Sequence, residues 1–416
     1  LQPHLVMEKI LFSAVVVVGL DNGFRVPPMG WSSWYGFTSN INEMMLREMG
    51  EGMVSSGLSK VGYKHIWIDD GWAIGRDNSS NPPGHVIVDP KLFPSGMRNL
   101  SDFLHDRGLK FGIYTSKGPL TCLGYQPTQP NRPGSCGYEQ VDADVYAHEW
   151  QVDQVKDDGC GQCPQHDPFI AMRNALNKTG RPIYYAIHST TTPGSPNATV
   201  ANMWRTGGDL YASSFAMWNN RLDFATTPSQ RALVGPGAFA NPDFLEVGYS
   251  PRAPKGRTQS ALEQRSMFTM WALLPGPLIL SADLRPNAAS GGIDADAFVT
   301  LTNTEVIAVN QDSLALPMEI VYNSSDGGQQ VWRKKLSAHN TDAVCFFNRG
   351  NDTKAPLPSP PIFSTMTVDF KALGYASKET VAVRDLWAKT SLGLFTGSFS
   401  ASVSLREAKI YTFVRK

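Results

Sequence analysis

Short apolar runs alternate with helical patterns along the first three quarters of the chain. Between about residue 25 and residue 312, each run of β-branched and aromatic residues is followed by a segment with apolar residues three or four positions apart. The runs include 65–68, 111–114, 152–156, 183–187 and 278–280. Two helical segments have clear starts, because Asp167-Pro168 suits an N-cap and first turn, and Ser260 with Glu263 has capping-box spacing.

This alternation predicts an α/β fold in which helices cover a parallel sheet. The length of the region suits a (β/α)8 TIM barrel over residues 21–312. A doubly wound open sheet is the alternative, but no early strand is followed by a G-x-G-x-x-G turn or a P-loop. After Asp312 short alternating strands with turn residues between them predict a C-terminal antiparallel β-sandwich domain over residues 313–416.

Composition excludes several partners. Lys and Arg number 37 and Asp and Glu also number 37, so the chain has no positive excess for nucleic acid or an anionic membrane. Apolar residues make up 42% and charged residues 18%, which is typical of an ordered globular protein that buries a large core. We expect no nucleic-acid partner and leave a homodimer open.

The amino-terminal segment fits a secretory signal. Its apolar run, 10–20, follows Met7-Glu8-Lys9 and is shorter than the roughly 20 residues that cross a bilayer, so we expect no membrane anchor and interpret residues 1–20 as a signal or upstream segment. Six Asn-x-Ser/Thr sequons favour the same route. They begin at Asn78, Asn99, Asn177, Asn197, Asn323 and Asn351. The sequence thus predicts secretion, or vacuolar or lysosomal delivery through the secretory pathway.

Five cysteines, at 122, 136, 160, 163 and 345, suit an oxidising compartment. Four of them lie close together in the sequence, which predicts one or two disulfides and a leftover thiol. Cys160-Gly-Gln-Cys163 is open to a redox or zinc interpretation, but no second C-x-x-C or paired histidine follows at zinc-finger spacing.

Carboxylates stand where the predicted barrel strands end, which is where such barrels place their functional groups. The candidates are Asp69-Asp70, Asp157-Asp158, and Asp209 after Trp204-Arg205. Because side chains alternate along a strand, Lys156 and Asp158 share one side and Asp157 faces the other. A cation beside Asp158 would keep it ionised, as a nucleophile requires. A second, protonatable carboxyl group, for which we favour Asp209, would complete the apparatus of glycoside hydrolysis.

Three simpler interpretations stay open at this point. Aspartates at strand ends often cap helices or accept hydrogen bonds from turn amides. Most large aromatic residues lie in the core, and we expect about one in three of the following to contact a ligand: Trp31, Trp34, Trp67, Trp72, Tyr114 and Trp204. Histidines 65, 105 and 148 could join the aspartates in a metal site, but no H-x-H or H-E-x-x-H spacing supports one, so we predict no metal.

Nine motifs, taken together, resemble family 27 of the glycoside hydrolases, the α-galactosidase family, which also contains α-N-acetylgalactosaminidases. They are Met29 to Trp34, Ile68 to Trp72, Lys110 to Tyr114, Lys156 to Cys160, Trp204-Arg205 with Asp209, Gly235 to Gly237, Asn241 to Asp243, Ser281 to Arg285, and Val309 to Asp312. The resemblance implies a (β/α)8 barrel followed by an antiparallel β domain. It also implies a retaining double displacement without metal or organic cofactor.

The resemblance assigns a role to individual positions. Asp158 falls on the family's nucleophile, Asp209 on its acid/base, and Asp69 and Asp70 on the pair that binds O4 and O6 of galactose. Lys156 and Arg205 fall on residues near the sugar hydroxyls. Trp34, Tyr114 and Asp243 fall on other pocket positions, and Cys122 and Cys160 on a disulfide beside the site. The implied partner is a carbohydrate with a terminal α-galactose.

The sequence departs from the family at several of these places. Ile187-His188-Ser189 replaces the usual Cys-Glu-Trp near the sugar's C2. We expect either that the smaller Ser189 leaves room for an acetamido group or that His188 hydrogen-bonds O2. Gly71 stands where a cysteine is frequent, and Cys136 with Cys163 could form an additional bridge. Asp157 replaces a common aromatic residue and could raise the pKa of Asp158.

We therefore predict an exo-acting retaining α-galactosidase. The alternatives are the same chemistry on an α-N-acetylgalactosaminide, a β-L-arabinopyranoside or an α-glucan, and a sugar-binding protein that has lost catalysis.

Overall fold

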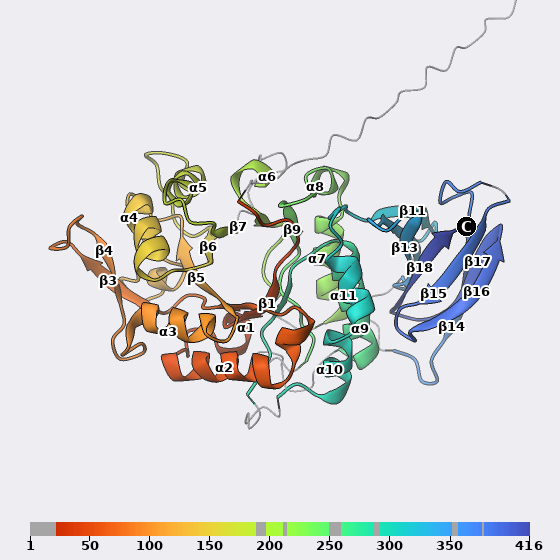
Figure 1. Cartoon of the computed structure of the whole chain (residues 1–416), viewed down its shortest axis with the longest axis horizontal. Helices are drawn as coiled ribbons and strands as arrows, with labels where there is room; N and C mark the ends of the chain where they lie inside the picture. Colours follow the sequence, from red (N-terminus) through yellow and green to blue (C-terminus); the bar gives the residue numbers. More distant parts are fainter. Residues whose placement is uncertain are drawn as a thin grey trace, which may run out of the picture.

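The computed structural model of the chain describes residues 22–188, 197–210, 214–248, 259–285, 292–351, 357–376 and 378–416. The predicted signal segment, residues 1–20, lies outside them. Figure 1 shows a barrel with helices around it, coloured from red to teal, beside an all-β domain in blue. No helix among the described residues has both the length and the apolar character needed to cross a bilayer.

Eight parallel strands form the barrel wall. Along the chain they are β1 (Met29–Ser32), β2 (His65–Trp67), β5 (Lys110–Ser116), β6 (Gln154–Asp158), β7 (Tyr184–Ile187), β8 (Met203–Arg205), β9 (Phe239–Asn241) and β10 (Leu278–Leu280). Their order in the sheet is β10-β1-β2-β5-β6-β7-β8-β9. A parallel bridge between Leu245 and Leu280 links the chain after β9 back to β10, and the Leu245 amide donates to the Ile279 carbonyl at 2.8 Å. The sheet therefore closes on itself, as the predicted barrel requires.

Helical segments occupy the connections between consecutive barrel strands, and two more, α10 and α11, follow the last barrel strand. They are α1 (Trp34–Phe37), α2 (Glu43–Ser55), η1 (Leu58–Val61), α3 (Gly96–His105), η2 (Leu123–Tyr125), α4 (Glu139–Asp144), η3 (Val145–Glu149), α5 (Pro168–Lys178), α6 (Asn197–Val200), α7 (Phe215–Ala225), α8 (Pro228–Arg231), α9 (Ala261–Leu273), α10 (Ala295–Leu301) and α11 (Thr304–Asn310). Both predicted helix starts are confirmed. The Asp167 side chain accepts from the Ile170 amide at 3.1 Å, and Ser260 with Glu263 forms a capping box.

One element of the barrel region has no counterpart among the predictions. A hairpin of β3 (Ala73–Asp77) and β4 (His85–Val88) projects from the connection after β2.

The second domain is the predicted antiparallel sandwich. Its strands are β11 (Glu319–Asn323), β12 (Gln329–Lys335), β13 (Thr341–Asn348), β14 (Phe363–Asp369), β15 (Thr380–Asp385), β16 (Thr390–Thr396), β17 (Ser398–Ser404) and β18 (Glu407–Arg415). Six of them form one sheet in the order β11-β12-β13-β18-β15-β16, and β14 pairs with β17 in a second, smaller sheet. Between the sheets lies an apolar core of its own, in which the rings of Phe399 and Phe413 meet edge to face at 5.5 Å.

The apolar core of the barrel extends across the junction into the second domain. Phe347 of β13 stacks on Trp218 of α7 with ring centroids 6.1 Å apart, and both belong to the same cluster as the barrel core. The buried Lys334 Nζ of β12 donates to the carbonyls of Ala272 (3.2 Å) and Val309 (2.7 Å) near the C-terminal ends of α9 and α11. Helix C-termini carry partial negative charge, so this lysine joins the sandwich to two barrel helices.

Candidate active site

A pocket of about 410 Å³ lies where the barrel strands end. The residues that line it come from strands or strand ends on several sides of the barrel. They are Trp34, Tyr35, Asp69, Tyr114, Cys122, Leu123, Gln126, Lys156, Asp158, Cys160, His188, Arg205, Gly208, Asp209, Asp243 and Phe244. Every predicted site residue except Asp70 is among them.

Asp158, the last residue of β6, is held by donors from three parts of the barrel. Its Oδ1 accepts from the Gly159 amide at 2.7 Å and lies 3.0 Å from His188 Nδ1, while its Oδ2 accepts from the Tyr114 hydroxyl at 3.0 Å. Burial opposes the charge, but the hydrogen bond from His188 and the charge of Lys156 outweigh it and hold the pKa of Asp158 well below its usual range. The carboxylate is therefore ionised at neutral pH.

Lys156 lies on the same face of β6 as Asp158, as the alternation of side chains predicts. Its Nζ lies 2.6 Å from Asp69 Oδ2, and its side chain is 13% exposed. Although burial opposes the cation, the charges of Asp69 and Asp158 raise the pKa of Lys156. The pocket floor thus holds one fixed cation between two carboxylates.

Asp157 faces away from the pocket, also as predicted. Its Oδ2 accepts from the Tyr185 hydroxyl at 2.7 Å, and its side chain is buried. Burial raises the pKa of Asp157 well above its usual range. The net shift in the pKa of Asp158 is downward, so the groups that favour its charge outweigh any opposing influence of Asp157.

Asp209 also lines the pocket, in the loop after β8, two strands along the sheet from β6. Arg205 Nη2 stands 3.3 Å from Asp209 Oδ1 and 2.9 Å from Asp243 Oδ2, so one guanidinium joins two carboxyl groups. Asp243 also accepts from the Leu210 amide at 2.8 Å and from the Tyr35 hydroxyl. These contacts fix the chain on either side of Asp209.

Asp70 does not line the pocket, but it accepts a hydrogen bond from Leu123, which does. Its Oδ2 accepts from the Leu123 amide at 2.8 Å, and its side chain is 2% exposed. Burial raises the pKa of Asp70 to about 6, and the negative charge of Asp69 adds to the increase. Asp69 and Asp70 are therefore adjacent in sequence but differ in place, since only Asp69 lines the pocket.

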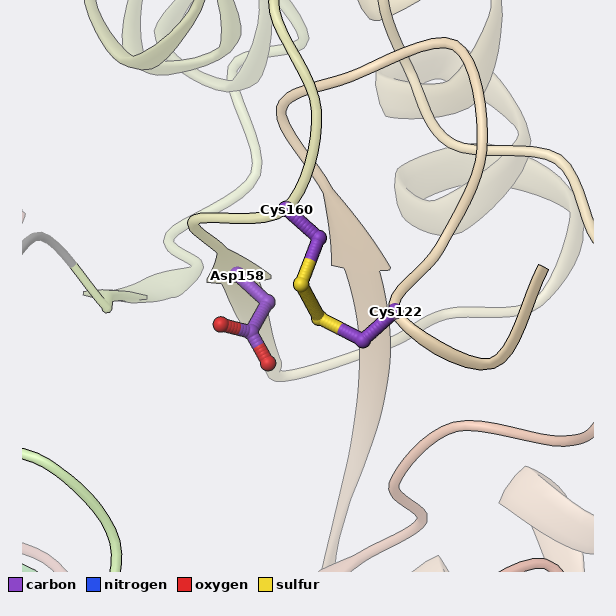
Figure 2. A group of neighbouring side chains, drawn as sticks. All are labelled: Cys122, Asp158 and Cys160. Carbon is purple, nitrogen blue, oxygen red and sulfur yellow. A yellow bond between two sulfur atoms is a disulfide. The ribbon is translucent and has the colours of Figure 1, made fainter. Parts of the chain in front are cut away.

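A disulfide joins Cys122, in the loop after β5, to Cys160, directly after β6. Figure 2 shows this bridge beside the Asp158 side chain. Cys136 and Cys163 form the second bridge that the sequence left open, and Cys345 is a buried free thiol. Where the family often has a cysteine at position 71, the Arg132 guanidinium instead donates to the carbonyls of Gly71 (2.6 Å) and Ala73 (2.9 Å). This hydrogen-bonded link ties the same loop by other means.

Two groups of residues in the described part of the chain have ligand atoms close enough to share a cation: Cys122 with Asp158 and Cys160, and Glu139 with Cys163 and His166. Every cysteine in these groups is in a disulfide, so neither group offers a thiolate. The C-x-x-C interpretation of Cys160 and Cys163 is therefore wrong for this oxidised state, since the two cysteines pair with different partners.

Of the six aromatic residues considered above, Trp34 and Tyr114 line the pocket. The other four, Trp31, Trp67, Trp72 and Trp204, are buried in the core. Several lining residues were not predicted from the sequence, although Tyr35 and Phe244 each directly follow a predicted pocket residue. Ser189, on which the argument about C2 partly rested, lies outside the described residues.

Comparison with known proteins agrees with this geometry. Residues 26–312 match the family described as Alpha galactosidase A, and residues 326–413 match the Alpha galactosidase C-terminal beta sandwich domain. A probable alpha-galactosidase of Dictyostelium discoideum is 36% identical over 92% of this chain and 91% of its own length. Alpha-galactosidase 2 of Arabidopsis thaliana is 35% identical over 95% of this chain and 92% of its own.

Among solved structures, alpha-galactosidase I from Mortierella vinacea superposes with a TM-score of 0.78 at 30% identity, covering 95% of this chain and 98% of that one. The family match spans most of the barrel and the relatives span nearly the whole chain. The chain therefore belongs to the α-galactosidase family, family 27 of the glycoside hydrolases.

Proposed function

We propose that the chain is a retaining exo-α-galactosidase that releases terminal α-D-galactosyl residues from oligosaccharides or glycoconjugates by double displacement. The observation that carries this proposal is one pocket that is lined both by an ionised carboxylate, Asp158, and by a second carboxyl group, Asp209. A nucleophile and an acid/base are the two groups that such a reaction needs.

In the first step a carboxylate oxygen of Asp158 attacks the anomeric carbon, and the bond from that carbon to the departing oxygen breaks. Asp209 gives its proton to the departing oxygen, so the aglycone leaves as a neutral alcohol. In the second step Asp209 takes a proton from water, and the resulting hydroxide oxygen attacks the anomeric carbon and displaces Asp158. Two inversions return the original configuration.

The proposed selectivity rests on the charged groups of the pocket floor. Asp69 and Lys156 form an ion pair that presents both an acceptor and a donor to sugar hydroxyls. An epimer that moves one hydroxyl would leave a buried charged group without its partner, which costs more than a lost contact in water. Trp34 and Tyr114 add flat apolar surface to the same pocket.

Passage through the secretory pathway is part of the proposal. Two disulfides and six sequons suit an oxidising, glycosylating compartment. The proposal includes both secretion from the cell and delivery to a vacuole or lysosome.

The test is a panel of four aryl glycosides: α-D-galactoside, α-N-acetyl-D-galactosaminide, β-L-arabinopyranoside and α-D-glucoside. We expect the highest kcat/KM on the α-galactoside, and proton NMR should show the α anomer of galactose as the first product. A higher kcat/KM on another sugar would replace the substrate but keep the mechanism. A first-formed β anomer would contradict double displacement, and sugar binding without turnover would favour a binding protein.

A further inference from the structure

His188 approaches Asp158 because β6 and β7 are neighbouring strands that remain paired up to their ends. The His188 amide donates to the Asp157 carbonyl at 3.0 Å. On the other side of Asp158, a Cβ placed on Gly159 would lie 2.6 Å from the His188 carbonyl oxygen, so only glycine fits there. The two strand ends therefore place His188 Nδ1 3.0 Å from Asp158 Oδ1, so the imidazole contacts the carboxylate directly.

The donors around Asp158 are distributed unequally between its two oxygens. Each carboxylate oxygen has two lone pairs that can accept hydrogen bonds. Oδ1 is occupied by the Gly159 amide and His188 Nδ1, whereas Oδ2 accepts from the Tyr114 hydroxyl. Among the described residues, Oδ2 is thus the oxygen that keeps a lone pair for the anomeric carbon.

Other charged and titratable groups near Asp158 act in both directions. They are Lys156 and Arg205, which favour its charge, Asp69 and Asp157, which oppose it when ionised, and Tyr114, which donates a hydrogen bond. Burial is the largest influence and opposes the charge, and His188 is the largest influence that favours it. Without His188, burial would act against Lys156, Arg205, the Gly159 amide and the Tyr114 hydroxyl.

From this geometry we propose that His188 is a positioning residue, which occupies Oδ1 of Asp158 and so fixes the carboxylate, in its ionised form, for attack through Oδ2. This inference rests on the proposed function, because it assigns a role to His188 within that reaction. It differs from the expectation that His188 binds the sugar at O2, since the imidazole acts through Asp158.

The experiment compares His188→Asn with His188→Leu in the full-length protein. Asn Nδ2 occupies the place of His Nδ1 and retains a neutral donor, whereas Leu has similar bulk and no donor. We expect the acidic limb of the pH profile of kcat/KM to move upward by about one pH unit or more in His188→Leu and kcat to fall about 10- to 100-fold. His188→Asn should restore most of both. Thermal unfolding of each variant reports on the fold separately.

Two further measurements separate the competing roles. The first repeats the His188→Leu comparison on an aryl 2-deoxy-α-galactoside: a positioning role predicts the same fold-loss with and without O2, whereas a role in binding O2 predicts a loss that disappears and would overturn the proposal. An acidic limb that does not move, or His188→Asn behaving like His188→Leu, would overturn it as well.

The second measurement does not depend on turnover. Carbon-13 NMR of Asp-labelled protein, with Asp158→Asn to assign the signal, follows the titration of Asp158 directly. We expect Asp158 to titrate at higher pH in His188→Leu than in the wild type, and an unchanged titration would contradict the inference. If the wild type hydrolyses no α-galactoside but the NMR shift occurs, the proposed function fails while the contact between His188 and Asp158 stands.

Discussion

The two carboxyl groups proposed to carry the reaction, those of Asp158 and Asp209, line the same pocket but have different surroundings. Asp158 receives donors from its own strand end, from β5 and from the residue after β7, and it lies near Lys156. Within the described residues, the carboxyl group of Asp209 contacts Arg205 at 3.3 Å. Its side chain is 21% exposed, compared with 14% for Asp158.

This difference matches the different requirements of a nucleophile and of an acid/base in a double displacement. A nucleophile must stay ionised and keep one orientation, so several fixed donors serve it well. An acid/base must lose a proton in one step and regain one in the next, and many fixed donors would hold it in a single state. The contacts around Asp158 and Asp209 therefore predict different responses to the same substitution.

The largest effect is expected for Asp158→Asn, which keeps the shape of the side chain and removes its charge. On an aryl α-galactoside we expect kcat/KM to fall by about 10⁴-fold or more, because no other group in the pocket replaces the nucleophile. Asp157→Asn is the matched control. Asp157 is buried, has a raised pKa and faces away from the pocket toward Tyr185, so an amide in its place should leave kcat/KM within about threefold of wild type. Equal losses in the two variants would remove Asp158 from its role.

A smaller and more selective effect is expected for Asp209→Asn. A sugar aglycone leaves poorly without a proton, so we expect a loss of about 10²- to 10⁴-fold on an oligosaccharide. A dinitrophenyl leaving group needs little protonation, and the loss in its formation of the glycosyl-enzyme should be far smaller. Pre-steady-state rates across a series of aryl leaving groups measure this dependence. The same fold-loss across the whole series would contradict the assignment of the acid.

The third effect concerns stability and separates Asp70 from the ionised Asp158. The pKa of Asp70 is raised to about 6, so the folded chain binds this proton more tightly than the unfolded chain does. Its contribution to stability is present below the unfolded pKa, near 4, and is lost as pH rises through about 6. The free energy of unfolding of Asp70→Asn relative to wild type should therefore increase by about 1–3 kcal/mol between pH 4 and pH 7.

The measurement is denaturant unfolding of both proteins at the two pH values. Asp209→Asn, at an aspartate that lines the pocket, serves as the control. Asparagine can still accept the Leu123 amide hydrogen bond, so the comparison isolates the charge. A difference between Asp70→Asn and wild type that does not change with pH would show that Asp70 is not a buried carboxyl group with a raised pKa.

The barrel, the sandwich and much of the pocket could be predicted from the sequence because they depend on local rules. Alternation along β6 alone places Lys156 and Asp158 on one side and Asp157 on the other. The disulfide from Cys122 to Cys160, by contrast, came from the family resemblance, because spacing among clustered cysteines permits several pairings.

What the sequence could not predict depends on contacts between distant segments. The distance from His188 to Asp158 follows from the close approach of two strand ends at Gly159, and nothing in the local pattern indicates it. Asp70 withdraws from the pocket because the Leu123 amide, 53 positions away, binds its carboxyl group. Closure of the barrel is likewise a long-range pairing, because Leu245, which bridges to Leu280 of β10, lies outside the runs that the pattern marks.

The contacts of Lys334 at the domain junction determine whether the barrel can be separated from the sandwich. Lys334 reaches out of the sandwich to the ends of α9 and α11, and Phe347 covers Trp218 of α7. A barrel cut free after Asp312 would expose those aromatic faces to water and leave the carbonyls of Ala272 and Val309 without the hydrogen bonds that Lys334 donates. The sandwich is thus a structural part of the catalytic unit, and the smallest piece of this chain that can be expected to work includes both domains.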